Sequence, residues 1–206
     1  EMAIVFAGYN PDRSPFLLLE FHNMTGLGGG PRMDGQEAGP YCLGNVANVS
    51  VEVIEAESPV MVEEYAFLPD TGGPGTHRGA LGIVRQFRLL AEKATVQVRS
   101  DRQKHKPWGL QGGGGGALGK CIMDPATDDE VATPSKFIGT MKRGQVFRGE
   151  MPGSGGHGYP FKRDVDAVLE DVRQEKVSLE HARTAYGVVI NDDGVDVAAT
   201  AKLRSV

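Results

Sequence analysis

The apolar residues of the chain gather in short runs that turn residues separate. Residues 3–7 and 15–21 are two such runs, and we predict two buried strands joined by a turn at residues 10–13. The second run is apolar at odd and even positions alike, with Leu17, Leu18, Leu19 and Phe21. A strand that is apolar on both faces is expected to leave surface that another part of the protein covers.

Alternating and short apolar runs predict further strands along the middle of the chain. Residues 49–54 alternate valines with polar residues, and residues 60–68 follow with a second run. Residues 83–90 and 94–99 stand at hairpin spacing, so we predict a hairpin with its turn at residues 91–93. Shorter strands are expected at residues 120–123, 137–140 and 145–148.

The last fifth of the chain changes to helical periodicity. Residues 164–173 carry Val165, Val168, Leu169 and Val172, the spacing of an amphipathic helix. A second helix at residues 179–186 follows the N-cap Ser178, and Gly187 ends it. A strand at residues 188–190 and a helix at residues 197–204 complete the pattern. The predicted fold class is α+β: a β-rich glycine-loop body (residues 1–160) and a helix–strand–helix tail (residues 161–206).

Glycine is the unusual component of this sequence. The 29 glycines are about twice the average share. They gather at residues 26–30, 70–82, 109–119 and 153–158. GxGxxG occurs at residues 114–119 and 153–158, but neither copy opens a predicted helix, so a dinucleotide site is excluded, and no P-loop motif is present. Two interpretations stay open: tight turns that pack strand against strand, or loops whose N–H groups hold an anion.

The charge and cysteine content narrow the class of protein. The net charge of −5 and the lack of a basic block argue against nucleic-acid binding. No apolar run reaches the roughly 20 residues of a membrane-spanning helix, and residues 1–8 lack the features of a signal peptide. Cys42 and Cys121 have no local partner, so we predict reduced core thiols in a cytoplasmic protein.

Residues 70–79 bring an acid, hydroxyls, a histidine and an arginine onto a sharply bending backbone. His77 has the chemistry of a general base or a ligand, and Arg78 that of a clamp for carboxylate or phosphate. The alternative is structural, with an ion pair between Asp70 and Arg78 that holds the loop.

Residues 100–109 form the next candidate segment. Asp101 and Arg102 end a strand, where a buried ion pair is expected. Lys104, His105 and Lys106 are interpreted as a solvated basic patch. Trp108, beside Pro107, is predicted to be a packing anchor rather than a platform for substrate.

Acidic residues and two further polar side chains complete the candidates. Glu52, Glu55, Glu57, Glu63 and Glu64 form a cluster, and Glu55 and Glu57 would share a strand face. Such carboxylates bind a divalent metal or simply face solvent. His22 and Asp34 flank the first glycine segment. They either line a site there or have only a structural role in the loop or core.

Taken in order, these segments resemble the hydantoinase B/5-oxoprolinase family. The matching residues run along nearly the whole chain: Gly28-Gly29-Gly30 and Met33-Asp34-Gly35; Glu52-Val53-Ile54-Glu55 and Ser58-Pro59; Asp70-Thr71-Gly72-Gly73-Pro74-Gly75 and Arg78-Gly79-Ala80-Leu81-Gly82; Ser100-Asp101-Arg102 and Pro107-Trp108-Gly109-Leu110; Pro152-Gly153-Ser154-Gly155-Gly156 and Gly158; Arg163-Asp164, Val177-Ser178, Ala182-Arg183 and Tyr186-Gly187-Val188.

The resemblance implies the C-terminal portion of a longer B-type subunit. Such subunits work with an A-type subunit that binds ATP and Mg, and the pair opens cyclic amides such as hydantoins, 5-oxoproline or lactams. Where a divalent metal is bound by the B-type subunit, its ligands are expected in the N-terminal portion of that subunit, outside this sequence. Related complexes carboxylate ketones, which gives the alternative function, and a third alternative is a structural module without catalytic residues.

The sequence departs from the family pattern at four positions. The family tends toward another residue at His77, toward glycine at Ala80 and Ser154, and toward aspartate at Tyr159. These departures leave the substrate open.

The last expectation concerns two glycine segments. We predict that residues 70–78 approach residues 153–158, which places His77, Arg78 and His157 at one cavity. The alternative puts the two loops at opposite ends of the body. With Asp101 and Arg102, these three residues are the predicted catalytic set: His77, Arg78, Asp101, Arg102 and His157.

Overall fold

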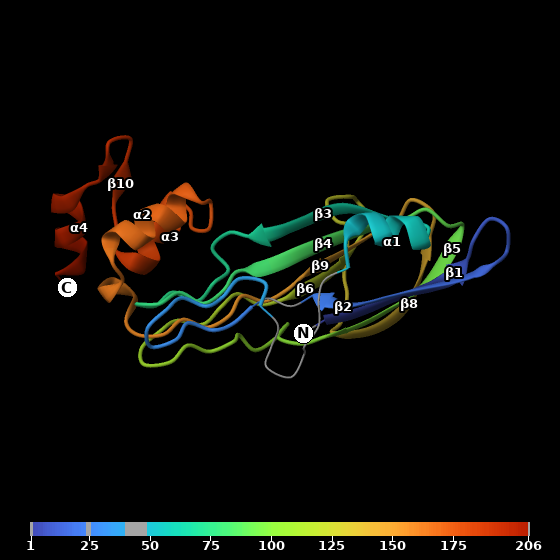
Figure 1. Cartoon of the computed structure of the whole chain (residues 1–206), viewed down its shortest axis with the longest axis horizontal. Helices are drawn as coiled ribbons and strands as arrows, with labels where there is room; N and C mark the ends of the chain where they lie inside the picture. Colours follow the sequence, from blue (N-terminus) through green and yellow to red (C-terminus); the bar gives the residue numbers. More distant parts are fainter. Residues whose placement is uncertain (1, 24–25, 40–48, 206) are drawn as a thin grey trace.

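The computed structural model describes residues 2–23, 26–39 and 49–205. The body of the protein is built from two antiparallel sheets (Figure 1). The first sheet has the strand order β2-β1-β5-β8. Its strands are β1 (Met2–Tyr9), β2 (Pro15–Asn23), β5 (Lys93–Ser100) and β8 (Lys136–Lys142).

The second sheet has the order β3-β4-β9-β6-β7. Its strands are β3 (Val60–Leu68), β4 (Gly82–Leu89), β6 (Lys120–Met123), β7 (Val131–Ala132) and β9 (Val146–Glu150). The predicted hairpin of residues 83–99 is therefore wrong. Both strands exist, but β4 and β5 belong to different sheets because the link between them crosses from one layer to the other, burying Ala91.

The inner faces of the two sheets share one hydrophobic core. Phe6 of β1 lies 5.5 Å from Phe87 of β4 and 6.5 Å from Phe147 of β9, measured between ring centroids. Alternate residues of β1 and β5 are buried, as a strand with one covered face requires. This core fixes the ends of the strands, from which the glycine segments extend.

The outer face of the first sheet carries exposed apolar side chains. Leu17 is 70% exposed and Leu19 42% exposed, whereas Leu18 packs against the core. The prediction that this strand is apolar on both faces is confirmed for these residues. The side chains of Phe21 and His22, and the whole of Cys42, lie outside the described residues.

Residues 49–54 are not a strand. They lead into the helix α1 (Val51–Glu57), in which Ile54 is the one buried residue. The amide and the hydroxyl of Ser58 both donate to the carbonyl of Ile54 and close the helix. The alternating valines favour a strand, but packing of Ile54 overrides this preference, and Val53 stays 43% exposed.

Because residues 51–57 are helical, Glu55 and Glu57 do not share a strand face as predicted. Glu55 lies on α1 and accepts a hydrogen bond from the amide of Val62 at 2.8 Å. Glu63 pairs with Arg88, and Glu64 pairs with Arg148. Three of the five carboxylates therefore contact protein groups.

The four glycine segments run out together from one end of the sandwich, toward the C-terminal helices (Figure 1). Backbone hydrogen bonds join them: the amide of Gly73 donates to Ser154 at 2.7 Å, that of Ala117 to Thr71 at 2.8 Å, and that of Ala80 to Leu27 at 3.1 Å. The glycine-loop end, defined as residues 26–39, 70–81, 102–119 and 151–159, is thus held by backbone contacts.

Close packing of backbones explains the glycine content. A Cβ atom at Gly153 would lie 1.7 Å from the carbonyl oxygen of Thr71, and one at Gly155 would lie 1.9 Å from that of Trp108. No side chain fits at such distances. Of the two interpretations left open by the sequence, close packing of the strands and loops is therefore confirmed. Anion binding by the loops stays a prediction.

The C-terminal unit follows the predicted pattern of helices. Its elements are η1 (Pro160–Lys162), α2 (Val165–Arg173), α3 (Leu179–Tyr186), β10 (Ile190–Asn191), β11 (Gly194–Val195) and α4 (Val197–Arg204). Ser178 caps α3 by accepting from the amide of His181, and Gly187 ends the helix at φ 64°. A separate hydrophobic cluster centred on Tyr186 holds this unit. The division at residue 160 stays a prediction.

The structure confirms the α+β class, with antiparallel sheets in the body and helices concentrated at the C-terminal end. In the part of the chain that the structure describes, no helix is long and apolar enough to cross a bilayer.

Candidate functional site

Two of the glycine segments meet at a pair of histidines. The amide of His77 donates to the carbonyl of His157 at 3.0 Å, and the amide of His157 donates back to His77 at 2.9 Å. The two residues thus form an antiparallel bridge. The predicted approach of residues 70–78 to residues 153–158 is confirmed, and the alternative with the loops at opposite ends is wrong.

The geometry of this bridge places both imidazoles on one side. Residues directly opposite in an antiparallel pair point to the same face, with Cβ atoms about 5 Å apart. Nδ1 of His77 lies 3.9 Å from Oδ1 of Asp34, and the His77 side chain is 28% exposed. The histidine bridge, defined as His77 and His157 with Asp34 beside them, is therefore partly exposed to solvent.

Arg78 has a different environment from its neighbour His77. Its side chain is only 3% exposed, and its guanidinium contacts Glu37 at 2.7 Å and Asp171 of α2 at 3.4 Å. The alternative ion pair between Asp70 and Arg78 is wrong, since the carboxylate of Asp70 accepts from the amide of Ser178. Arg78 thus connects the glycine-loop end to the C-terminal unit.

Arg163 makes the second connection. Its guanidinium donates to both carboxylate oxygens of Asp34, at 2.6 and 2.7 Å, and to Asp171 at 2.8 Å. Its side chain is 3% exposed. Together with Arg78, Glu37 and the buried Asp171, these residues form one network, called the buried ion-pair network below.

The network alters the proton affinities of its members. Burial disfavours the charged carboxylate of Asp34, but the hydrogen bonds and charge of Arg163 outweigh this, so the pKa of Asp34 lies below its ordinary 3.8. Burial also opposes the charge on Arg78, yet Asp171 and Glu37 hold its pKa above the ordinary value. Both groups are therefore ionised at neutral pH.

Asp101 and Arg102 do not form the predicted buried pair. Asp101 is 66% exposed at its side chain and contacts Nζ of Lys136 at 3.2 Å. The guanidinium of Arg102 instead lies over the ring of Trp108, 4.9 Å from its centroid. Trp108 is 68% exposed, so the prediction of a packing anchor is also wrong. The pairing fails because the backbone of Arg102 turns into the left-handed region, at φ 61°.

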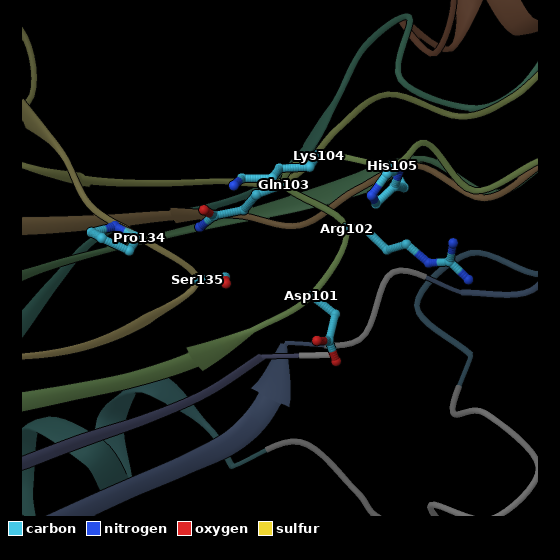
Figure 2. Close-up of a pocket in the computed structure, with 7 residues that line it drawn as sticks. All are labelled: Asp101, Arg102, Gln103, Lys104, His105, Pro134 and Ser135. Carbon is cyan, nitrogen blue, oxygen red and sulfur yellow. The ribbon is translucent and has the colours of Figure 1, made fainter.

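Arg102 borders two adjoining hollows. The first holds about 570 Å³ (Figure 2). It is lined by Asp101, Arg102, Gln103, Lys104, His105, Pro134 and Ser135. The second holds about 310 Å³ and is lined by Gly28, Arg102, Pro107, Trp108, Pro152, Gly153, Ser154 and Gly155. In Figure 2 the side chains of Asp101 and Arg102 extend in different directions.

The predicted site residues therefore fall into three environments. The bridge holds His77 and His157, the buried ion-pair network holds Arg78, and the hollows hold Asp101 and Arg102. The basic patch of Lys104, His105 and Lys106 is exposed as predicted, and two of its members line the larger hollow. Among the described residues, no three His, Cys, Asp or Glu side chains come together as metal ligands.

Sequence reasoning missed Arg163, Asp171 and Glu37. One signal was present, because Asp171 stands three residues after Val168 on the apolar face of α2. A carboxylate on a buried helix face requires a charged partner. The partners themselves lie 93 and 8 residues away in sequence, so only the fold identifies them.

The comparisons with known proteins match this architecture. The sequence profile of the family described as hydantoinase B/oxoprolinase matches residues 1–160. The chain is 32% identical, over 87% of its length, to the B-type subunit of a putative D-/L-hydantoinase from Pseudomonas sp. (strain NS671). It is also 32% identical, over 86% of its length, to the beta subunit of caprolactamase from Pseudomonas jessenii.

Solved structures agree with the sequence matches. The crystal structure of ATP-dependent caprolactamase from Pseudomonas jessenii superposes with a TM-score of 0.88 at 28% identity, covering 99% of this chain and 37% of that one. A nucleotide-free acetone carboxylase superposes over 100% of this chain and 32% of that one, with a TM-score of 0.76. Its identity of 21% shows a shared fold only.

The match is extensive for this chain but partial for its relatives. The aligned region spans 31% of the hydantoinase protein and 32% of the caprolactamase one. The sequence profile, the sequence relatives and the caprolactamase structure all indicate the same family. The chain belongs to the hydantoinase B/oxoprolinase family.

Proposed function

We propose that this chain is part of an ATP-dependent enzyme that opens cyclic amides, as the C-terminal portion of a B-type subunit. The observation that carries the proposal is its 32% identity, over more than four fifths of its length, to the corresponding subunits of a hydantoinase and of caprolactamase. The matched structure of the second is that of an ATP-dependent enzyme.

The chemistry of a cyclic amide explains why such an enzyme consumes ATP. Amide resonance makes the carbonyl carbon a poor electrophile. Phosphorylation of the amide oxygen weakens this resonance and makes the carbon more electrophilic. Water then adds to the carbon, the C–N bond breaks while the nitrogen takes a proton, and a second water releases phosphate. A protein that assists these steps requires a proton carrier, fixed donors for the developing anion and exclusion of bulk water.

The five predicted residues receive different roles in this proposal. The imidazoles of His77 and His157 carry protons at the histidine bridge. Arg102 holds an anion at the hollows, and Asp101 lines the larger of them. Arg78, buried between Glu37 and Asp171, positions the loops and does not touch the substrate.

The proposal includes partners and cofactors that belong to the rest of the assembly. We propose an A-type subunit that binds ATP and Mg, and an N-terminal portion of the B-type subunit that holds any divalent metal. The exposed Leu17 and Leu19 are proposed to contact one of these parts, since apolar patches on a sheet face favour a cover. A cytoplasmic location is also proposed, supported by the free thiol of buried Cys121.

The test is ATP turnover by the chain reconstituted with the rest of its B-type subunit and with an A-type partner. Hydantoins, lactams and 5-oxoproline are compared with ketones plus bicarbonate. Stimulation by cyclic amides is the expected result. Stimulation by ketones and bicarbonate alone would replace the proposal with the ketone-carboxylase function of the acetone carboxylase type.

A second set of variants tests the structural-module alternative. His77→Ala, His157→Ala and Arg102→Ala are compared with Arg143→Ala, a solvent-exposed arginine in the turn after β8. Loss of turnover in the first three, with folding and assembly retained, supports participation in chemistry. Full turnover in all of them would show that the chain serves only as a scaffold.

A further inference from the structure

Arg102 differs from five other arginines of the protein, which form ion pairs. Arg78, Arg85, Arg88, Arg148 and Arg163 each contact a carboxylate. Arg102 contacts no carboxylate in the described part of the chain, although it is partly buried and borders both hollows. A partly buried guanidinium without a protein anion is a site that attracts an anion from solution.

The neighbouring charges do not neutralise it. The side chain of Asp101 extends in a different direction from that of Arg102 (Figure 2), and its carboxylate contacts Lys136. Lys104 and His105 line the same hollow, and Lys106 follows them in sequence. The protein as a whole carries a net charge of −5, so this local excess of cations is a distinct feature of the surface.

The backbone of Arg102 is held in a conformation that suits glycine better. Its φ of 61° lies in the left-handed region, and the amide of Gly119 fixes the turn by donating to the carbonyl of Arg102 at 3.1 Å. The side chain is steadied by the Trp108 ring. A strained, oriented side chain at the rim of a hollow suggests a role in binding, because a glycine there would serve the fold at lower cost.

The second hollow adds backbone donors. The amides of Gly28, Gly153 and Gly155 donate to no other described residue, although all three line the hollow. Backbone amides beside a guanidinium are common protein donors for phosphate oxygens.

We propose that the two hollows joined at Arg102, called the Arg102 site, bind the phosphoryl group of a small phosphorylated ligand. Several basic side chains and backbone amides around one point match a tetrahedral dianion better than a planar carboxylate. The volumes of about 570 and 310 Å³ are sufficient for a phosphoryl group and a small ring attached to it. That the ligand is the phosphorylated cyclic amide rests on the proposed function; binding of the phosphoryl group does not.

The chain contains its own reporter for this site. Trp108 is the single tryptophan of the sequence, so its emission reports on the neighbourhood of Arg102. The full chain is titrated with inorganic phosphate and, separately, with acetate at equal ionic strength. Emission and calorimetry are recorded in parallel, because calorimetry detects binding that leaves the emission unchanged.

The expected result is saturable binding of phosphate, with acetate at least about 10-fold weaker. Arg102→Ala is expected to weaken phosphate binding by roughly 10-fold or more, since a charge-assisted hydrogen bond contributes that much. Arg102→Lys keeps the charge but loses the planar donor pair, so an intermediate affinity is expected. Arg143→Ala, at the opposite end of β8 from Lys136, is expected to bind as the unchanged chain does.

Three outcomes would overturn the proposal. They are the absence of saturable binding in both measurements, equal affinity for acetate and phosphate, and an unchanged affinity in folded Arg102→Ala. Circular dichroism establishes that each variant is folded. If the chain binds phosphate but no cyclic amide stimulates ATP turnover in the assembly, the proposed function fails while the Arg102 site stands; the reverse result removes the site and leaves the function.

Discussion

The sandwich and the glycine-loop end of this protein are stabilised by opposite means. In the sandwich, aromatic side chains such as Phe6, Phe87 and Phe147 fill the space between two sheets. In the glycine-loop end, backbones touch one another, and Gly153 has no room for a Cβ atom. The candidate site residues His77, Arg102 and His157 lie in this second region.

The glycine loops need interactions other than apolar packing to hold them in place. Backbone contacts without side chains bury little apolar surface, so other interactions have to hold the loops in place. The buried ion-pair network supplies them through Arg78 and Arg163, which tie the loops to Asp171 on α2. The C-terminal unit is therefore a support for the region that carries the candidate site.

The largest effect is expected in the sandwich. Phe87→Ala removes a side chain that is 0% exposed and contacts Phe6, so we expect a loss of about 3–5 kcal/mol in the free energy of unfolding. Urea denaturation measures it. Phe67→Ala, at a position 45% exposed, is the control and should lose far less. Equal losses in both would show that the sandwich core does not dominate stability.

Arg163→Ala is expected to be nearly as damaging, although it lies outside the sandwich. The change leaves Asp34 and Asp171 without a main cation, which costs about 3 kcal/mol for a buried pair. Hydrogen exchange should show lost protection in residues 70–81 and in α2, with the sandwich amides still protected. Arg173→Ala, whose side chain is 66% exposed, is the matched control. Uniform loss of protection would mean that both regions unfold as one unit.

Gly153→Ala tests backbone packing directly. Because the new Cβ atom meets the carbonyl of Thr71, the loops have to separate, and we expect a loss of about 2 kcal/mol. At Gly30 the nearest atom to an added Cβ is 3.7 Å away, an ordinary contact, so Gly30→Ala should be close to neutral. Thermal unfolding of the two variants decides the point, and similar midpoints would contradict close packing at Gly153.

A smaller effect is expected from pH. The pKa of Asp34 is lowered in the folded protein, so its contribution is complete above the ordinary value of 3.8 and is lost as the pH falls through the folded pKa. The difference in unfolding free energy between the unchanged chain and Asp34→Asn should therefore shrink between about pH 6 and about pH 3. Urea titrations at both values measure it, and a constant difference would exclude Asp34 as a source of acid sensitivity.

The smallest effect on stability, and of opposite sign, is expected at Arg102. Arg102→Gly removes the strain of a left-handed arginine and should leave stability unchanged or raise it by about 0.5–1 kcal/mol. The same variant should lose phosphate binding. Thermal unfolding and calorimetry on one sample check both. A marked loss of stability would show that the side chain is kept for the fold and not for a ligand.

The sequence predicts the elements better than their arrangement. The helix α3 follows directly from Ser178, the apolar positions and Gly187, because these signals are local. The prediction for residues 49–54 fails, since the burial of Ile54 selects a helix against the valine alternation. The supposed hairpin fails for a related reason, because strand spacing does not say to which sheet a strand belongs.

The candidate site divides in the same way. The meeting of His77 with His157 was predictable from glycines that end strands and leave space for another backbone. The separation of Asp101 from Arg102 was not, since it depends on one backbone angle and on the position of Trp108. Likewise, nothing local connects Arg163 with Asp34, which lies 129 residues away.

By itself the sequence determined the family, the α+β class and the helical C-terminal unit. It also indicated the glycine segments as the region of the candidate site. These properties depend on periodicity, caps and motifs that neighbouring residues create. The tertiary structure alone decided which sheet each strand joins, that Arg78 is a buried connector, and that Arg102 faces two hollows without a carboxylate among the described residues. The physical reason is that burial and ion pairing join residues far apart in the chain, where the pattern of neighbours carries no information.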